Sequence, residues 1–141
     1  PREELSYLRI VRAFQYEKPL ADLAVAASAR RGPNDVTGLP EIQIDLTIAP
    51  EHVTFAPVDG RHVASVEVAV FLLDHADRAI DQVWQRLELN LRDETYARTM
   101  ASGLTHHASF GRAAEAAAIK VVVYDYAADL VGSAVAPLAK Q

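Results

Sequence analysis

The stretch that decides the fold is GRHVASVEVAVFLLD, residues 60–74, in which hydrophobic residues recur at every second position. Because successive side chains of a β-strand point to opposite faces, this alternation is typical of a strand that buries one face. The residues of that face are Val66, Val68, Val70 and Leu72. The preceding pair Asp59-Gly60 predicts a tight turn, since glycine takes up a positive φ at no steric cost. The stretch therefore predicts a strand that follows a hairpin turn.

The same alternation recurs on both sides of this stretch. EIQIDLTI, residues 41–48, alternates branched apolar side chains with polar ones, and residues 119–138 indicate two strands folded back on each other. Further strands are expected in the segments 19–28, 53–55, 80–91 and 104–110. Gly132 is expected to permit a bulge or close packing in the returning strand. The segment 30–40, which contains Gly, Pro, Asn and Asp, is predicted to be a surface loop.

Two segments follow the helical period instead. In residues 2–14, apolar positions recur at three-residue steps and predict a short amphipathic helix. These positions are Leu5, Leu8, Val11 and, less regularly, Phe14. A second short helix is expected near residues 93–101, because two acidic residues begin the segment and Gly103 can end it.

About seven short strands, frequent turn signals and two brief helices predict an all-β chain. We expect an immunoglobulin-like antiparallel β-sandwich, with a small barrel as the main structural alternative. Residues 1–18 are expected to form an N-terminal helical or linker segment, and residues 19–141 the β-sandwich domain. A chain of 141 residues is long enough to bury a core without disulfides.

Composition narrows the classes of function. The formal net charge is −5, which argues against a nucleic-acid or anionic-membrane surface, and the arginines near residue 31 are too scattered to reverse this. The chain has no cysteine, so it has no disulfide, no thiolate metal site and no cysteine nucleophile. The longest apolar run is too short for a membrane span.

Three segments carry a resemblance: GRHVASVEVAVFLLD (60–74), RLELNLRDETYARTMASGL (86–104) and IKVVVYDYAADLVGSAVAPL (119–138). Together they resemble the C-terminal region of bacterial, acidobacterial-type von Willebrand factor A-related proteins, without the A domain itself. The residues at matching positions are Asp59, Gly60, Asp74, Glu94, Tyr96, Gly103, Asp125, Gly132 and Ser133. The chain departs from the pattern at GRAAEAAA (111–118) and YAAD (126–129), where the strand register is least defined. The resemblance implies an exported protein in an extracellular or periplasmic location.

The five histidines are the first candidates for a metal or catalytic site, since neutral imidazole binds metal ions and transfers protons. His106 and His107 are neighbours in an expected strand, so their side chains should point to opposite faces and not hold one ion. A site built from His52, His62 and His75 would require the fold to gather three separate turns. We expect no bound metal and no cofactor.

Acidic residues in turns are the second set of candidates. Asp74 and Asp77, together with His75, offer calcium ligands within one turn, but their spacing is not that of a calcium loop, so a solvated hairpin turn is expected. Asp125 and Asp129 are expected at the tip of the last hairpin. Both should lie in solvent there and stabilise the turn instead of acting as an acid–base pair.

Hydroxyl and aromatic side chains give weaker signals. The serines Ser65, Ser102, Ser109 and Ser133 lie outside any Gly-x-Ser-x-Gly elbow, and no phosphate-binding loop pattern occurs. Trp84 is expected to cover the sheet on the face opposite Val83. The alternative is that Trp84 and Tyr96 form an exposed aromatic contact for a sugar or peptide.

The sequence therefore predicts a non-enzymatic accessory or interaction module of a larger exported bacterial protein. It would act through a protein partner or an adjacent domain, for example along an edge strand. No catalytic, cofactor-binding or metal-binding residue is assigned. The alternative is a small hydrolase or carbohydrate-binding protein that uses the histidines and acidic turns, which would require a concave site with converging polar groups.

Overall fold

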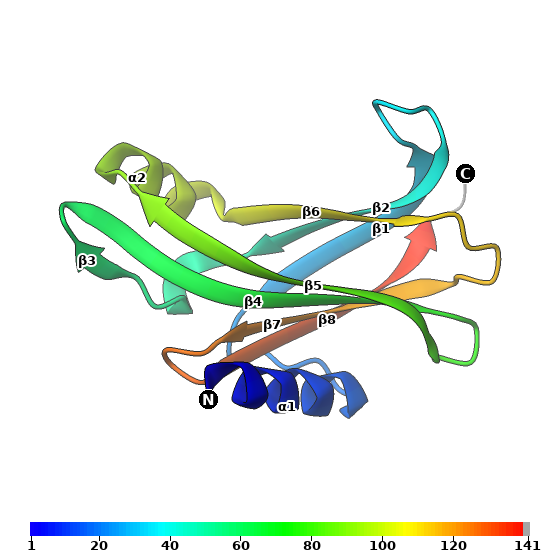
Figure 1. Cartoon of the computed structure of the whole chain (residues 1–141), viewed down its shortest axis with the longest axis horizontal. Coiled ribbons are helices and arrows are strands. Elements are labelled where there is room, and N and C mark those ends of the chain that lie inside the picture. The colour runs from blue at the N-terminus through cyan, green and yellow to red at the C-terminus, as the bar shows by residue number, and fades with distance from the viewer. Residues whose placement is uncertain (140–141) are drawn as a thin grey trace.

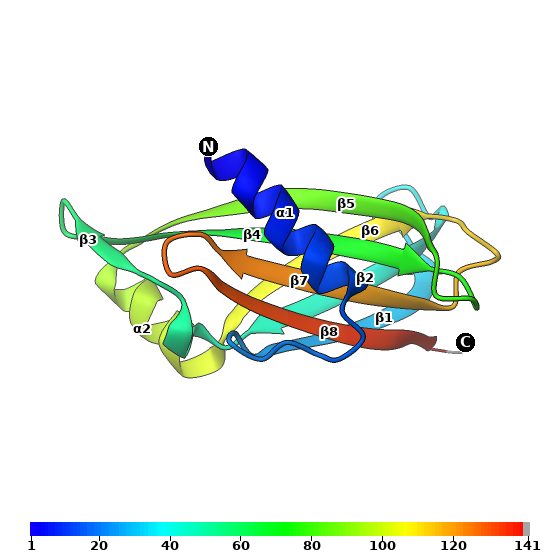
Figure 2. The ribbon, with the colours of Figure 1, turned by 90° about the horizontal axis from the view of Figure 1, so that it is seen from below.

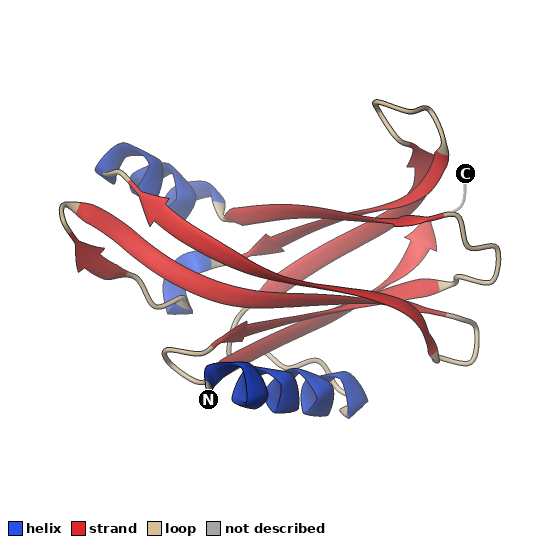
Figure 3. Cartoon of the chain, viewed as in Figure 1, coloured by secondary structure: helices blue, strands red, loops and turns tan. Residues whose placement is uncertain are grey.

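The structure is a computed structural model that describes residues 1–139. Its helices are α1 (Arg2–Gln15), the 3-10 helix η1 (Pro50–His52) and α2 (Asp93–Ser102). Its strands are β1 (Val25–Pro33), β2 (Pro40–Ile48), β3 (Ala56–Val58), β4 (Arg61–Leu73), β5 (Ala79–Leu91), β6 (Leu104–Gly111), β7 (Ala118–Asp125) and β8 (Leu130–Ala139). Figure 1 and Figure 3 show a mostly β protein, which confirms the predicted class and both predicted helices.

One curled, eight-stranded sheet makes up the body of the protein. Its strands follow the order β3-β4-β7-β8-β1-β2-β6, and β5 pairs with the other edge of β4. The pairings are antiparallel except that of β1 with β8, which is parallel at Ala29 with Leu138 and Arg30 with Ala139. The sheet is therefore mixed, which the alternation pattern did not predict, because alternation is the same for either strand direction. This arrangement does not confirm a sandwich of the immunoglobulin type.

The hydrophobic core lies on the inner face of the curled sheet. It is built from alternate residues of β2, β4 and β7, including the predicted face of β4. The fully or almost fully buried members from these strands include Ile44, Leu46, Val66, Val70, Leu72, Ile119 and Val121. Val83, Leu87 and Leu89 of β5 pack against this core, and Trp84 lies on the other face of β5, as predicted.

The curl brings β5 and β6 toward each other, and we call the gap between their free edges the seam. Neither strand pairs with the other through its backbone within the described residues. A side-chain hydrogen bond crosses the seam, between His106 Nε2 and Gln85 Oε1 at 2.7 Å. At one end of the seam, α2 connects β5 to β6, as Figure 1 shows.

Helix α1 covers the outer face of the sheet over β4 and β7, as Figure 2 shows. Its buried residues are Ser6, Ile10 and Ala13. Of the predicted positions, Phe14 packs beside them, whereas Leu8 is 57% exposed. A strict three-residue step falls short of the 3.6 residues of a turn, and the stripe therefore drifts around the helix. Because α1 covers them, β4 and β7 are buried on both faces along most of their length.

The first hairpin, formed by β1 and β2, is displaced along the chain from its predicted position, because β1 begins at Val25 and not at residue 19. Strand β1 continues to Pro33, which pairs with Pro40, so the loop comprises residues 34–39 and not 30–40. The Asn34 side chain organises this loop, since its Oδ1 accepts hydrogen bonds from the N–H groups of Val36 and Thr37. The predicted turn at Asp59-Gly60 is confirmed: both residues have positive φ, and they join β3 to β4.

Candidate functional site

His106 and His107 point to opposite faces of β6, as predicted. His106 lies at the seam against Gln85, whereas His107 lies on the outer face. There His107 Nδ1 contacts Asp45 Oδ1 at 2.8 Å and its Nε2 contacts Gln43 Oε1 at 2.7 Å. The two imidazoles therefore have separate partners and do not share a site.

The contacts of His107 belong to a row of polar side chains along the outer face of β2 and β6. Gln43 Nε2 donates to Glu41 Oε1, and Asn34 Nδ2 donates to the same oxygen, both at 3.0 Å. Gln43 is buried beneath this row, while His107 is exposed. The arrangement can donate and accept hydrogen bonds along two strands, but its carboxylates and imidazole already have hydrogen-bond partners within the row.

The other three histidines stay apart. His62 on β4 stacks on Tyr96 of α2 at 3.8 Å between ring centroids, and its Nε2 contacts Asp93 Oδ1 at 2.8 Å. His52 lies in η1 and His75 in the turn between β4 and β5. Within residues 1–139, no group of three or more histidine, aspartate or glutamate side chains could hold a metal ion.

The position of His106 predicts that the stability of the protein depends on pH. Burial, and then the neighbouring His107, lower the pKa of His106, so the unfolded chain takes up its proton at a higher pH than the folded chain. Stability should therefore be full above about pH 6.5 and should fall as the pH decreases through the pKa of the folded state. We expect the His106→Gln variant to lose less stability on acidification than the wild type, as measured by urea unfolding at several pH values.

The matched control for this prediction is His75→Gln, in an exposed turn. It removes one histidine without changing the seam, and its unfolding is measured under the same conditions. Identical pH dependence in the His106 variant and the wild type would contradict the prediction.

The carboxylate of Asp74 accepts hydrogen bonds from the backbone of its own turn. Asp74 Oδ1 accepts hydrogen bonds from the N–H groups of Ala76 and Arg78, at 2.9 and 3.0 Å. The Arg78 backbone bond is the main cause of the lowered pKa of Asp74. This use of the carboxylate agrees with the predicted hairpin turn.

The last hairpin has a different structure from the one expected. Asp125 is only 1% exposed, so the prediction that it lies in solvent is wrong. Its Oδ2 accepts the N–H of Thr54 at 2.8 Å, and its Oδ1 accepts that of Ala127 at 3.0 Å. The segment that leads into β3 packs over the hairpin and excludes water, which no local pattern shows. Asp125 therefore stabilises its turn, as predicted, and also ties it to residue 54.

Asp129 connects the same hairpin to α1. Its Oδ1 accepts hydrogen bonds from the Tyr124 hydroxyl at 2.7 Å and from Arg9 Nε at 2.9 Å. Burial, and then the neighbouring Asp129, raise the pKa of Tyr124 to about 12. Asp125 and Asp129 thus bind different partners and do not form an acid–base pair.

The remaining candidates have structural contacts. Ser133 Oγ accepts the N–H of Leu20, and Ser65 Oγ accepts a hydrogen bond from Arg2. Trp84 lies between Tyr7 and Phe71 on the outer face, which confirms that it covers the sheet. Tyr96, on α2, contacts His62 and Phe55 instead, so the two aromatic residues do not form one surface.

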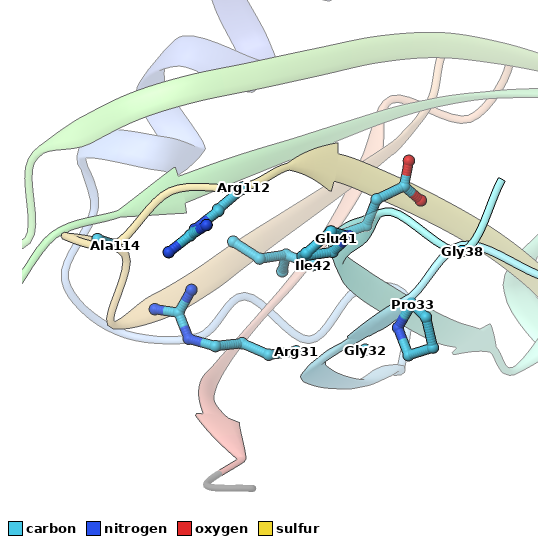
Figure 4. Close-up of a pocket in the computed structure, with 9 residues that line it drawn as sticks. Arg31, Gly32, Pro33, Gly38, Glu41, Ile42, Arg112 and Ala114 are labelled. Atoms are coloured by element: carbon cyan, nitrogen blue, oxygen red, sulfur yellow. The ribbon is translucent and has the colours of Figure 1, made fainter.

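A cleft of about 620 Å³ lies at the end of the β1–β2 hairpin, beneath the segment that follows β6. Arg31 and Arg112 both line it, and Figure 4 shows their side chains directed to the same side of the cleft. Arg31 donates to the carbonyl oxygens of Ala113 and Ala116, at 2.8 Å each. The sequence did not predict this cleft, because Arg31 and Arg112 are far apart along the chain. Arg31 lies within the predicted loop 30–40 and Arg112 within the segment 111–118, whose register was least defined, so no common sequence signal links them.

Comparison with protein-family models, with curated proteins and with solved structures finds no match for this chain. The chain belongs to the class of mostly β proteins and is built on a curled mixed sheet with two α-helices. Within the described residues, no helix is both long enough and apolar enough to cross a membrane. The resemblance to von Willebrand factor A-related proteins stays a prediction.

Proposed function

We propose that this protein is a non-enzymatic interaction module that accepts a β-strand of a protein partner or adjacent domain along the free edge of β6. The observation that carries the proposal is the chemistry of this edge. Strand β6 pairs with β2 without interruption from Leu104 to Gly111, and its other edge has no backbone partner within residues 1–139. Unpaired N–H and C=O groups along a regular strand are a template for another strand.

Edge strands in natural proteins are usually protected by charged residues, proline, bulges or short length. The sequence of β6, LTHHASFG, contains no lysine, arginine, acidic residue or proline, and its pairing with β2 shows no bulge. In contrast, β5 carries Asp81, Arg86 and Glu88, and β3 is only three residues long. Of these three strands, β6 is the one that lacks these protective features.

The neighbouring side chains indicate what kind of strand would fit. An added strand would direct alternate side chains into the seam, where Val83, Leu87 and Leu89 of β5 are only partly buried. Its other side chains would extend the polar row of the outer face. A strand that alternates apolar and polar residues therefore suits this edge, with backbone hydrogen bonds supplying affinity and side chains supplying specificity.

The immunoglobulin-like topology, which rests on the pattern of strands and turns, belongs to this proposal. So do the exported location and the kinship with von Willebrand factor A-related proteins, which rest on the resemblance of the sequence. The alternative function, a hydrolase or carbohydrate-binding protein, gains no support from a specific observation. The histidines and acidic turns that it would use have separate structural partners.

The proposal predicts that a suitable peptide protects the β6 amides from hydrogen exchange. The probe is an end-capped, uncharged peptide with the sequence of residues 41–48 in which both acidic residues are replaced by threonine. In NMR exchange measurements at millimolar peptide, every second amide of β6 should become protected, because only alternate N–H groups face the free edge. The amides of β5 near its charged residues should remain unprotected.

Two controls make this test specific. The same peptide with N-methylated backbone amides cannot donate hydrogen bonds and should give no protection. The variant Thr105→Lys/Ser109→Lys places charges along β6 and should lose protection, whereas Ala26→Lys/Ser28→Lys on the central strand β1 should retain it. Absence of β6 protection in the wild type, or equal protection by the methylated peptide, would overturn the proposal.

A further inference from the structure

A groove of about 340 Å³ lies where β1 begins, β2 ends and the last turn of α2 meets them. Its lining comprises residues 24–26, 49–51 and 100–103 together with Thr47, and we call it the α2 groove. Its volume lies within the usual range of small-molecule sites. The groove contains no residue of β6, so it is separate from the edge to which the function proposed above belongs.

The side chains of the α2 groove supply one negative charge and no positive charge. Among the described residues that line the groove, Glu51 is the only charged one. Its side chain is exposed and forms no hydrogen bond or ion pair with any residue that the structure describes. The carboxylate of Glu51 therefore keeps its acceptor oxygens for a ligand.

The C-terminal end of α2 adds to this negative potential, because the carbonyl groups of a last helical turn carry a partial negative charge. The Gly103 N–H donates to the Thr99 carbonyl at 2.8 Å, whereas the carbonyl oxygens of residues 100–102 have no donor within the helix. The last turn contains no basic residue. Arg98, just before it, donates to Thr95 Oγ1 in the preceding turn, at 3.3 Å. The end of the helix thus favours a cation in the groove.

The rest of the lining is mainly apolar and accessible. Val25 of β1 and Met100 of α2 are half-buried, and Ala26 is exposed. These side chains offer a surface on which a hydrocarbon chain can leave water, which is favourable. A hydrated metal ion would gain nothing from this surface and would need several further oxygen ligands. The lining therefore suits an organic cation better than a metal ion.

We propose that the α2 groove binds a small primary alkylammonium cation. The ammonium group donates a charge-assisted hydrogen bond to the carboxylate of Glu51 and faces the carbonyl end of α2. The alkyl chain lies against Val25 and Met100. A neutral alcohol of the same length lacks the charge, and the ammonium ion itself lacks the chain, so neither matches both parts of the groove.

The test titrates the protein with pentylammonium chloride, with pentanol and with ammonium chloride, at constant ionic strength. Met100 is the only methionine of the chain, so a labelled methionine methyl group reports on this groove alone in NMR spectra. We expect pentylammonium to shift the signals of this methyl group and of the Glu51 amide until they saturate. Pentanol and ammonium chloride should bind more weakly, since each provides only one of the two contacts.

A lysine side chain carries the same ammonium group, so a further titration uses lysine that is blocked at both backbone ends. Weaker binding of blocked lysine than of pentylammonium identifies a free amine as the ligand. Equal binding identifies lysine side chains of a partner as a second source. Both results support the ammonium chemistry and distinguish its origin.

The first decisive variant is Glu51→Gln, which removes the charge at an exposed position. It should weaken pentylammonium binding about threefold to fivefold, the usual effect of losing one exposed ion pair. Glu17→Gln changes the net charge equally at an exposed position outside the groove and should bind as the wild type does.

The second decisive variant is Ala101→Lys, which places a cation in the last turn of α2. A lysine suits the C-terminal end of a helix, so the variant should fold and should lose pentylammonium binding through repulsion and occupation of the groove. Ala97→Lys is the matched control, because it adds the same charge to an exposed position of the same helix, one turn outside the groove. It should retain most of the binding.

Two kinds of result would overturn this assignment. Unchanged affinity in Glu51→Gln or in Ala101→Lys would show that pentylammonium binds elsewhere or only as a general counter-ion. Binding of pentanol as tight as that of pentylammonium would show that the groove selects no charge. The Glu51→Gln variant should still pair with the β6 peptide, so the two proposals fail or succeed separately.

Discussion

Replacing Gly132 by alanine is expected to lower the free energy of unfolding by about 3 to 5 kcal/mol, the largest loss that we predict for one added methyl group. A Cβ at this position would overlap the backbone carbonyl of Leu23. Leu23 is completely buried, and a backbone carbonyl cannot rotate aside as a flexible side chain can. The segment before β1 would therefore have to move off β8.

That movement would break specific hydrogen bonds. The Ser133 N–H donates to the Leu20 carbonyl, and the Leu20 N–H donates to Ser133 Oγ, both at 2.9 Å. Urea unfolding measures the loss. Gly111→Ala is the matched control, since no heavy atom lies within 4 Å of a Cβ built there, and it should leave stability unchanged. A Gly132→Ala variant as stable as the Gly111→Ala variant would contradict the packing described here.

The second large effect is expected at Asp125. The Asp125→Ala substitution should cost about 3 kcal/mol, because it removes a buried carboxylate that accepts two backbone hydrogen bonds, each of the charge-assisted kind. The N–H of Thr54 and that of Ala127 would lose their acceptor. Asp125→Asn keeps the shape and one acceptor oxygen, so its cost should be about half as large. Equilibrium unfolding of the three proteins gives the comparison.

Asp35→Ala provides the control for this prediction. Asp35 is exposed in the 34–39 loop, and its substitution should change stability by no more than about 0.5 kcal/mol. If Asp125→Ala cost no more than Asp35→Ala, the carboxylate of Asp125 would be in water, as the sequence alone suggested. Hydrogen exchange at the Thr54 amide would supply a second, local measurement, because its protection depends on Asp125 Oδ2.

The local pattern of apolar and turn-forming residues was sufficient to predict most of the secondary structure. The alternation in residues 41–48 and 66–72 predicts both strands and the face of each that lies in the core. It does not predict that α1 also buries the other face of β4. Asp59-Gly60 predicts its turn because the requirement for positive φ is local. Neighbouring histidines on one strand must diverge for the same reason, as His106 and His107 do.

The candidate sites could be predicted from the sequence less well than the secondary structure. The burial of Asp125 depends on residue 54, and the cleft depends on residues 31 and 112, which are distant along the chain. Ile10 and Ala13 became the buried face of α1 because the sheet presents Phe71 and Tyr124 to them. In each case the deciding contact joins segments that no local window includes.

The sequence by itself determined that this chain is mostly β, where its two α-helices lie and which faces of its central strands are apolar, because backbone geometry turns local spacing into side-chain direction. Only the tertiary structure decided that β1 pairs in parallel with β8, that β6 is left with an unprotected edge and that Arg31 and Arg112 share a cleft. Strand order, edges and clefts arise from contacts between distant segments. Alternation specifies which face of a strand is buried, but not which strand lies beside it.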